Sequence, residues 1–167
     1  VNTTVDTENP SAQIISPISG QIFNTDSVEV RANYANTYIV TCKAQLDSQD
    51  FVDMLGDEQT SGTAYHTFTS IPDGLHSFTV DCQDQAGNHQ TDTVTDIRID
   101  TVPPVTYDDY AYHDTWTNEN AIIALTAFDP TPGSGLAWTK YCIDTSNTCT
   151  PDTEYTNVIT IDTEGIY

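Results

Sequence analysis

The stretch HSFTVDCQDQAGN, residues 76–88, decides how this chain folds. In its first half apolar residues alternate with polar ones, and this period of two predicts a β-strand with one buried face. In its second half Gly87 and Asn88 tolerate positive φ, which predicts a tight turn into the next strand. We expect Asp84 to accept hydrogen bonds from the amides of that turn.

A calcium loop is the alternative interpretation of this stretch, because it holds Asp81, Asp84, a glycine and an asparagine at loose loop spacing. An EF-hand loop needs ligands at alternating positions, a central glycine and a glutamate at position twelve. Here Cys82 interrupts the ligands and Asp92 takes the twelfth position, so the EF-hand interpretation fails. A turn and a calcium site made of Asp84 and linker oxygens do not exclude each other.

The same period of two recurs through the first part of the chain, where long apolar patterns of helical period are absent. The alternation shifts near Asp96, where we expect a β-bulge. Turn residues such as Asp73-Gly74 separate the runs, and this spacing predicts an antiparallel β-sandwich. The residues expected to face its core are Val28, Val30, Ala32, Val40, Cys42, Ala44, Leu46, Phe78, Val80, Cys82, Val94, Ile97 and Ile99.

The composition limits the partners of the protein. Its 167 residues carry 25 acidic side chains against four Lys and Arg, for a net charge of -21. Such a surface repels nucleic acid and anionic lipid, so we expect neither as a partner. No apolar run approaches the roughly 20 residues that span a bilayer, so we expect no membrane insertion.

A linker divides the chain. The stretch IDTVPPV, residues 99–105, carries two prolines, which cannot donate to a strand ladder and which stiffen the backbone. New alternating runs follow it, and VDTENPSAQI at the start of the chain echoes IDTVPPVTYD, as expected of a tandem array. We therefore expect an N-terminal linker or donor segment over residues 1–8, one domain over 9–101 and a second over 102–167.

The motifs VDTENPSAQIISPISGQIF, IPDGLHSFTVDCQDQAGN and IDTVPP resemble the bacterial and archaeal Ig-like repeats of large cell-surface proteins, with their D-T-x-P-P linkers and D-x-A-G-N strand ends. TWTNENAIIALTAFDPTPGSGLAWTKYCID and ITIDTEGIY are similar to a related Ig-like repeat. The resemblance covers nearly the whole chain. It implies an all-β protein with two tandem Ig-like antiparallel β-sandwiches.

The second sandwich departs from this pattern at its C-terminal end. In the repeats that it resembles, E-G-x-Y opens a strand that ends in another D-x-A-G-N, but here the sequence stops at Tyr167. Roughly two strands are therefore expected to be missing. Either the full protein continues, or a neighbouring copy supplies a strand from its residues 1–8, where Val1, Thr3 and Val5 alternate. A head-to-tail contact of this kind that does not close gives a filament.

The four cysteines pair within the two halves, Cys42 with Cys82 and Cys142 with Cys149. An even number in an acidic, Thr-rich chain suggests disulfides and an extracellular setting. Metal ligation or free thiols are the alternative, although the spacing of the second pair is not that of a zinc ribbon. The resemblance makes the strands of Cys42 and Cys82 neighbours, with Cα atoms expected within the roughly 4.4–6.8 Å that disulfides need.

Candidate calcium ligands lie at the two junctions that the linkers form. Where the first linker enters, Asp6 and Asp84 would meet with Glu8 and Asn36. At the second junction the equivalents are Asp100 and Asp129. Calcium needs six to eight oxygens, so a solvated acidic rim is the alternative. No cofactor is expected to be required. Asn2 begins one N-glycosylation sequon.

Residues that would carry catalysis are not evident. No serine nucleophile motif occurs, and two sandwiches in tandem do not suggest the cleft that a carboxylate pair such as Asp108 and Asp109 would need. The resemblance implies a non-enzymatic structural module of an extracellular surface protein: an adhesin stalk, a surface layer or a self-associating filament subunit. The alternative is a carbohydrate-binding or accessory module of a secreted enzyme, with Trp116 and Trp138 as a sugar platform.

Overall fold

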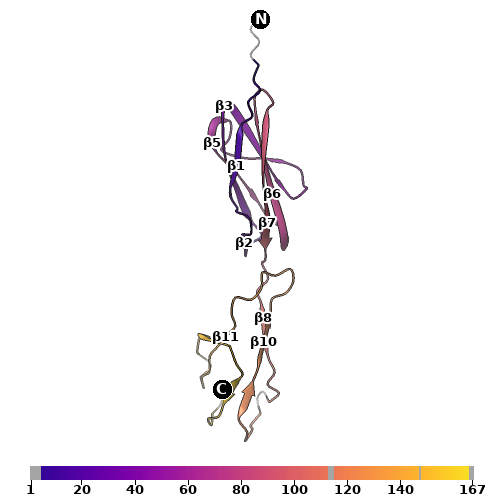
Figure 1. The fold of residues 1–167 in the computed structure, drawn as a ribbon. Helices are drawn as coiled ribbons and strands as arrows, with labels where there is room; N and C mark the ends of the chain where they lie inside the picture. Colours follow the sequence, from indigo (N-terminus) through magenta and orange to yellow (C-terminus); the bar gives the residue numbers. More distant parts are fainter. Residues whose placement is uncertain (1–4, 113–114, 147, 166–167) are drawn as a thin grey trace. The chain divides into compact units, whose positions relative to one another are not determined.

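A computed structural model describes residues 5–112, 115–146 and 148–165. The chain divides into two compact units, Val1–Thr101 (unit 1) and Val102–Tyr167 (unit 2), and each is described by itself (Figure 1). The described residues form strands, turns and loops without a helix, so the all-β prediction is confirmed. Within these residues no helix is long and apolar enough to cross a membrane.

Unit 1 is a sheet of seven strands that folds over on itself. The longest strand, β3, has 19 residues and belongs to both layers. Its first part pairs antiparallel with β1 and β5, and its second part with β4 and β6. The strands are β1 (Ser11–Ser16), β2 (Ile22–Phe23), β3 (Val28–Leu46), β4 (Val52–Asp53), β5 (Gln59–Phe68), β6 (Gly74–Asp84) and β7 (His89–Ile99).

The two runs that the sequence separates, around Val30 and Cys42, thus form one continuous strand. Its pairing with β5 shifts register between Ala35 and Val40, where the chain passes from one layer to the other. The first layer contains β1, the first part of β3 and β5. The second contains β4, the second part of β3, β6 and β7. This arrangement is the Ig-like β-sandwich that the sequence predicts.

The core of unit 1 lies between these layers, and all thirteen residues predicted to face it are buried. The bulge is also confirmed, because Asp96 has a φ of 61° and the pairing of β6 with β7 shifts beside it. Alternation along each strand therefore determines which face is buried. Further buried members of the core are Tyr34, Met54, Ala64, Phe68 and Ile71.

The chain enters and leaves unit 1 at opposite ends (Figure 1). Ser11, the first residue of β1, lies opposite Ala35, close to the end of β6 that carries Asp84. Ile99, the last residue of β7, lies opposite Gly74 at the other end of β6. β2 pairs parallel with β7, whereas the other pairs in this unit are antiparallel. A strand near the start of the unit is therefore bonded directly to its last strand.

Unit 2 consists of three small antiparallel pairs in its described part. β8 pairs with β10, β9 pairs with β13 and β11 pairs with β12. These three pairs correspond to the pairs that β3 of unit 1 forms with β1, with β5 and with β4, respectively. Counterparts of β6 and β7 do not occur among its described residues. The strands are β8 (Val105–Asp108), β9 (Ala121–Ile123), β10 (Leu125–Phe128), β11 (Lys140–Tyr141), β12 (Thr153–Glu154) and β13 (Ile159–Ile161).

The core of unit 2 is correspondingly thin. Ile159, which lies opposite Ile123, is the one large apolar side chain among the described residues of this unit that is buried. Tyr155 connects two of the pairs, since its hydroxyl accepts a hydrogen bond from the Leu125 amide at 3.0 Å and its ring contacts Tyr141 edge-on. The described strands of unit 2 therefore leave much of their apolar surface exposed.

The four basic residues of the protein all lie in strands. Arg31 and Lys43 are in β3, Arg98 is in β7 and Lys140 is in β11. Arg31 forms an ion pair with Glu29 at 2.9 Å, and Lys43 forms one with Asp53 at 3.5 Å. The loops and turns of the described residues therefore contain acidic residues but no Lys or Arg.

Candidate functional site

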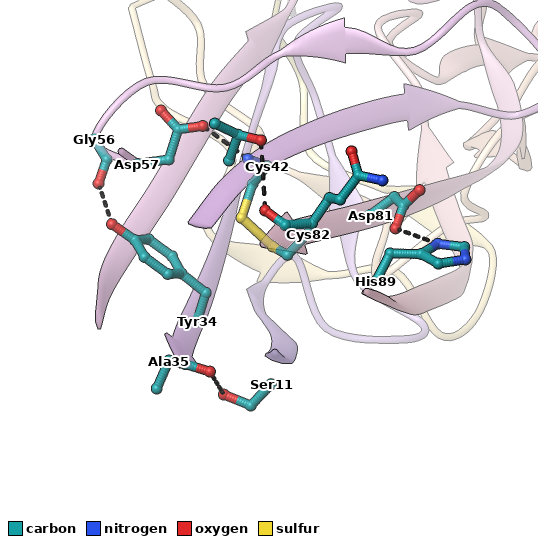
Figure 2. The surroundings of a disulfide bond; sticks show 11 residues. Ser11, Tyr34, Ala35, Cys42, Gly56, Asp57, Asp81, Cys82 and His89 are labelled. Carbon is teal, nitrogen blue, oxygen red and sulfur yellow. Dashed lines mark hydrogen bonds and ion pairs between the residues drawn. A yellow bond between two sulfur atoms is a disulfide. The ribbon is translucent and has the colours of Figure 1, made fainter. Parts of the chain in front are cut away.

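The disulfide between Cys42 and Cys82 lies in the layer of β3 and β6, where the two residues are directly opposite (Figure 2). Their Cα atoms are 4.1 Å apart, below the range expected from the sequence. The backbone groups of Cys42 bond away from β6, to Asp57 and Met54, so this is a pair without ladder hydrogen bonds. Such pairs approach more closely than hydrogen-bonded ones.

A small polar cluster protects the edge of the strand beside this disulfide (Figure 2). The Asp57 carboxylate accepts a hydrogen bond from the Cys42 amide at 2.7 Å, and the Tyr34 hydroxyl donates to the Gly56 carbonyl at 2.9 Å. Burial, and then the nearby Asp57 charge, raise the pKa of Tyr34. The sequence indicates Asp57 only as a loop acid, because no local pattern reveals that it meets Cys42.

The second disulfide joins Cys142 and Cys149, with Cα atoms 6.2 Å apart. The Asp144 carboxylate organises the loop between them, since it accepts hydrogen bonds from the amides of Thr148 at 2.9 Å and Cys149 at 3.0 Å. Both disulfides predicted from the sequence are therefore present. The first links two neighbouring strands of a sheet, and the second closes a short loop.

The turn at Asp84 is built as the sequence predicts. One carboxylate oxygen accepts hydrogen bonds from the amides of Ala86 at 2.8 Å and Asn88 at 3.0 Å. The other accepts from the side-chain amides of Asn88 at 3.0 Å and Asn36 at 3.1 Å. Burial opposes the charge, but the bonds from Asn88 and Ala86 outweigh it and lower the pKa of Asp84.

The same two asparagines hold the segment that precedes β1. Asn88 donates to the Asp6 carbonyl at 3.3 Å, and Asn36 donates to the Glu8 carbonyl at 3.5 Å. The four residues proposed for the first calcium site therefore do meet. However, the Asp84 carboxylate already accepts hydrogen bonds from amides, and Asp6 and Glu8 contribute backbone oxygens to these contacts rather than carboxylates.

The carboxylate of Asp6 has one oxygen that no hydrogen bond occupies. One oxygen accepts the Glu8 amide at 3.0 Å, and the other is buried without a hydrogen-bond partner. Asp129 in unit 2 is similar, with one oxygen bonded to the Gly135 amide at 2.6 Å and the other buried and unpartnered. Over the described ranges, no three His, Cys, Asp or Glu side chains group as metal ligands. Calcium binding therefore stays a prediction.

The remaining candidates divide between the two units. Asp100 is buried at the exit end of unit 1, where its amide donates to the Phe23 carbonyl at 2.9 Å. Asn2, the glycosylation candidate, lies outside the described residues. Trp116 and Trp138 are both exposed in unit 2, and the Lys140 ammonium lies 4.7 Å from the Trp138 ring centroid.

A network that the sequence does not reveal closes the exit end of unit 1. His76 lies between two acceptors, the Asp47 carboxylate and the Pro72 carbonyl, each at 2.8 Å. Asp73, the residue after Pro72, accepts hydrogen bonds from the amide of Thr101 at 3.1 Å and from its hydroxyl at 3.0 Å. Burial raises the pKa of Asp47, but its bonds from His76 and the adjacent serine outweigh this and lower it.

Comparisons with known proteins show what kinds of fold this chain is similar to. No protein-family model matches it, and no curated protein does. Fibronectin(III)-like modules of Clostridium thermocellum CbhA are 13% identical with a TM-score of 0.46, and the match covers 78% of this chain and 65% of theirs. An engineered protein is 16% identical with a TM-score of 0.43 and coverages of 55% and 20%. This chain thus spans less than two thirds of either structure.

Proposed function

We propose that this chain is a non-enzymatic structural module of an extracellular surface protein, one that transmits tension along a stalk, a surface layer or a filament. The observation that carries the proposal is the parallel pairing of β2 with β7, combined with the entry and exit of the chain at opposite ends of unit 1. This role is mechanical and does not require a ligand.

Tension on the two ends of unit 1 would load this pair in shear. β2 and β7 both run from the entry end toward the exit end. A pull toward the N-terminus and a pull toward the C-terminus therefore act parallel to the two strands and perpendicular to the hydrogen bonds between them. The Arg98 amide donates to the Gln21 carbonyl at 3.0 Å, and the Asp100 amide donates to the Phe23 carbonyl at 2.9 Å. Such bonds must break together, whereas a pair pulled open from one end loses them in turn.

Side-chain contacts fix the connecting segments at each end of the same unit. Asn36 and Asn88 hold the backbone before β1, and Asp73 holds Thr101, the last residue before unit 2. Because the segments are tied to the sandwich, a pull on them is passed directly to the strands. The two disulfides support an oxidising, extracellular setting, where such bonds form and persist.

Single-molecule pulling of the whole chain from its two ends tests the proposal. Asp100→Pro removes the amide that bonds Phe23, and we expect it to lower the force at which unit 1 opens. Asp100→Ala removes the same side chain but keeps the amide, so it is the matched control and should open at a higher force than the proline variant. Equal forces for the two variants would show that the β2–β7 pair does not resist tension.

The length released on opening gives a second readout. The disulfide closes a sequence separation of 40 residues in unit 1. At about 3.6 Å per extended residue, reduction should lengthen the release by roughly 140 Å. An unchanged length would mean that the bridge does not limit the extension of this unit.

Carbohydrate binding is a second candidate function, favoured by the exposure of both tryptophans. Trp116 is 79% exposed and Trp138 is 62% exposed, and such aromatic rings can stack on a sugar ring. A glycan-array signal that Trp138→Ala or Trp116→Ala abolishes would support it. A wild-type protein that gives no signal on such an array would remove this candidate and leave the structural one.

A further inference from the structure

Strand β11 of unit 2 has an unpaired edge. β12 occupies one side of it, with Lys140 opposite Glu154 and Tyr141 opposite Thr153. The Tyr155 amide donates to the Thr139 carbonyl at 2.8 Å, so the backbone N–H and C=O groups of residues 139 and 141 point toward β12. Because bonding directions alternate along a strand, the amides of Lys140 and Cys142 point to the other edge. Among the described residues no strand pairs there.

Unit 1 shows what such an edge receives when it is complete. The corresponding part of β3 pairs with β4 on one side and with β6 on the other. β6 runs antiparallel and directs Phe78, Val80 and Cys82 into the core, where each is fully buried. The occupant that fits an edge of this type is therefore an antiparallel strand with apolar or β-branched residues at alternate positions.

The apolar face next to β11 is only partly covered. Tyr141 contacts the Tyr155 ring on the inner face, and Ile143 follows two residues later on the same side of the chain. Ile143 is 45% exposed, whereas the equivalent inward positions of β3 in unit 1 are buried. An added strand would cover Ile143 and satisfy the two outward amides at once. Exposed edges of this kind recruit other strands.

Charge restricts the segments that can pair there. Residues 102–167 carry ten Asp and Glu side chains and one lysine, so an acidic strand is repelled. The sequence V-N-T-T-V, residues 1–5, has no charged side chain and is rich in β-branched residues. Its positions 1, 3 and 5 are Val, Thr and Val, and Val5 is 79% exposed.

The structure also shortens the candidate donor. The backbone carbonyls of Asp6 and Glu8 are bonded to Asn88 and Asn36 of their own unit, so these residues are held. The eight-residue donor expected from the sequence therefore reduces to the five residues before Asp6. These five residues carry no charged side chain and precede a backbone that is held in place, which suits them to contact with another molecule.

We propose that residues 1–5 of one copy add to the free edge of β11 in a second copy, as an antiparallel strand with Val5 directed toward the inner face. The contact is head-to-tail, because the donor and the acceptor lie on different units, and its repetition produces a filament. This inference rests on the proposed role in surface assembly and names the partner as a second copy of the chain.

Amide hydrogen exchange in the intact protein tests the contact. The Lys140 and Cys142 amides should become protected as the protein concentration rises. Val5→Asp places a charge on the inward face and should weaken association by more than about tenfold. Thr4→Asp adds the same charge on the outward face and is the matched control, which should retain most of the protection.

Three outcomes would overturn the proposal. Protection that does not depend on concentration would mean pairing within one copy or with residues that follow Tyr167 in a longer chain. Equal loss in the two variants would reflect net charge rather than strand pairing. No protection at any concentration would mean that the edge stays open. The pulling experiment compares variants at Asp100 in unit 1, so its failure is distinguishable from each of these.

Discussion

Units 1 and 2 begin with the same three strand pairings, but only the first buries a continuous core. In unit 1 the inward residues of β3 are covered by β6 and β7, so Val30, Val40 and Ala44 are fully buried. In unit 2 the described strands stop before those counterparts, and Leu125 and Tyr141 stay partly exposed. The comparison teaches that the last two strands, rather than the first five, close an Ig-like sandwich.

Truncation of a core side chain should give the largest difference between the units. Phe78→Ala in unit 1 leaves a cavity in a fully packed site and should destabilise that unit by about 3–5 kcal/mol. The matched variant Leu125→Ala in unit 2 removes a side chain that water already reaches, so its cost should be clearly smaller. Urea unfolding followed by tyrosine and tryptophan signals measures both, since both tryptophans lie in unit 2. Equal costs would contradict the comparison.

Removal of the disulfides should produce a smaller difference in stability loss between the two units than truncation of a core side chain does. In the loop-entropy model, loss of the bridge across 40 residues costs about 4 kcal/mol, and loss of the bridge across seven costs about 2.5 kcal/mol. Replacing Cys42 and Cys82 with serine should therefore destabilise unit 1 more than the corresponding change at Cys142 and Cys149 destabilises unit 2. Thermal unfolding of the two double variants checks the order, and a reversed order would refute it.

Acid should destabilise unit 1 through Asp84. Its folded-state pKa is lowered, so it contributes stability that is present above the unfolded pKa of about 3.9 and is lost as the pH falls through the folded value. Asp84→Asn should flatten this part of the pH dependence. Asp152→Asn in unit 2 is the charge-matched control and should leave the acid unfolding of unit 1 unchanged. Identical profiles for wild type and Asp84→Asn would remove Asp84 as the cause.

Calcium should have the smallest effect on stability. Its addition tests whether both units bind a cation at a buried aspartate oxygen. If the unpartnered oxygens of Asp6 and Asp129 bind calcium, a tenfold excess over the Kd would stabilise each unit by about 1.4 kcal/mol. Asp6→Asn should cancel the effect in unit 1 and Asp129→Asn in unit 2. Melting curves that millimolar calcium does not move would eliminate both sites.

Sequence reasoning succeeds in this protein where the determinants are local. Alternation identifies the inward face at Val80 and Val94, and turn chemistry identifies the role of Asp84. The shift of register near Asp96 identifies the bulge. Each of these depends on residues that are neighbours in the chain, so the printed sequence contains the whole signal.

Long-range contacts carry no such signal. The parallel pairing of β2 with β7 joins residues 22 and 98, and the bond between Asp57 and Cys42 depends on how a loop packs against an edge. The anchoring of Asp6 by Asn88 spans 82 positions. A polar residue that bonds across such distances resembles any other surface acid or amide until the fold brings the two together.

The position of the basic residues has a consequence for resistance to proteolysis. Proteases with the specificity of trypsin cut after Lys or Arg in chain that can adopt an extended, mobile form, as loops and termini do. Here every such residue lies in a strand, so Arg31, Lys43 and Arg98 become cleavable only when unit 1 opens. Lys140 is less protected, because no strand among the described residues pairs with the second edge of β11. Digestion would therefore begin at Lys140, and the rate of that first cut would depend on whether the edge is filled.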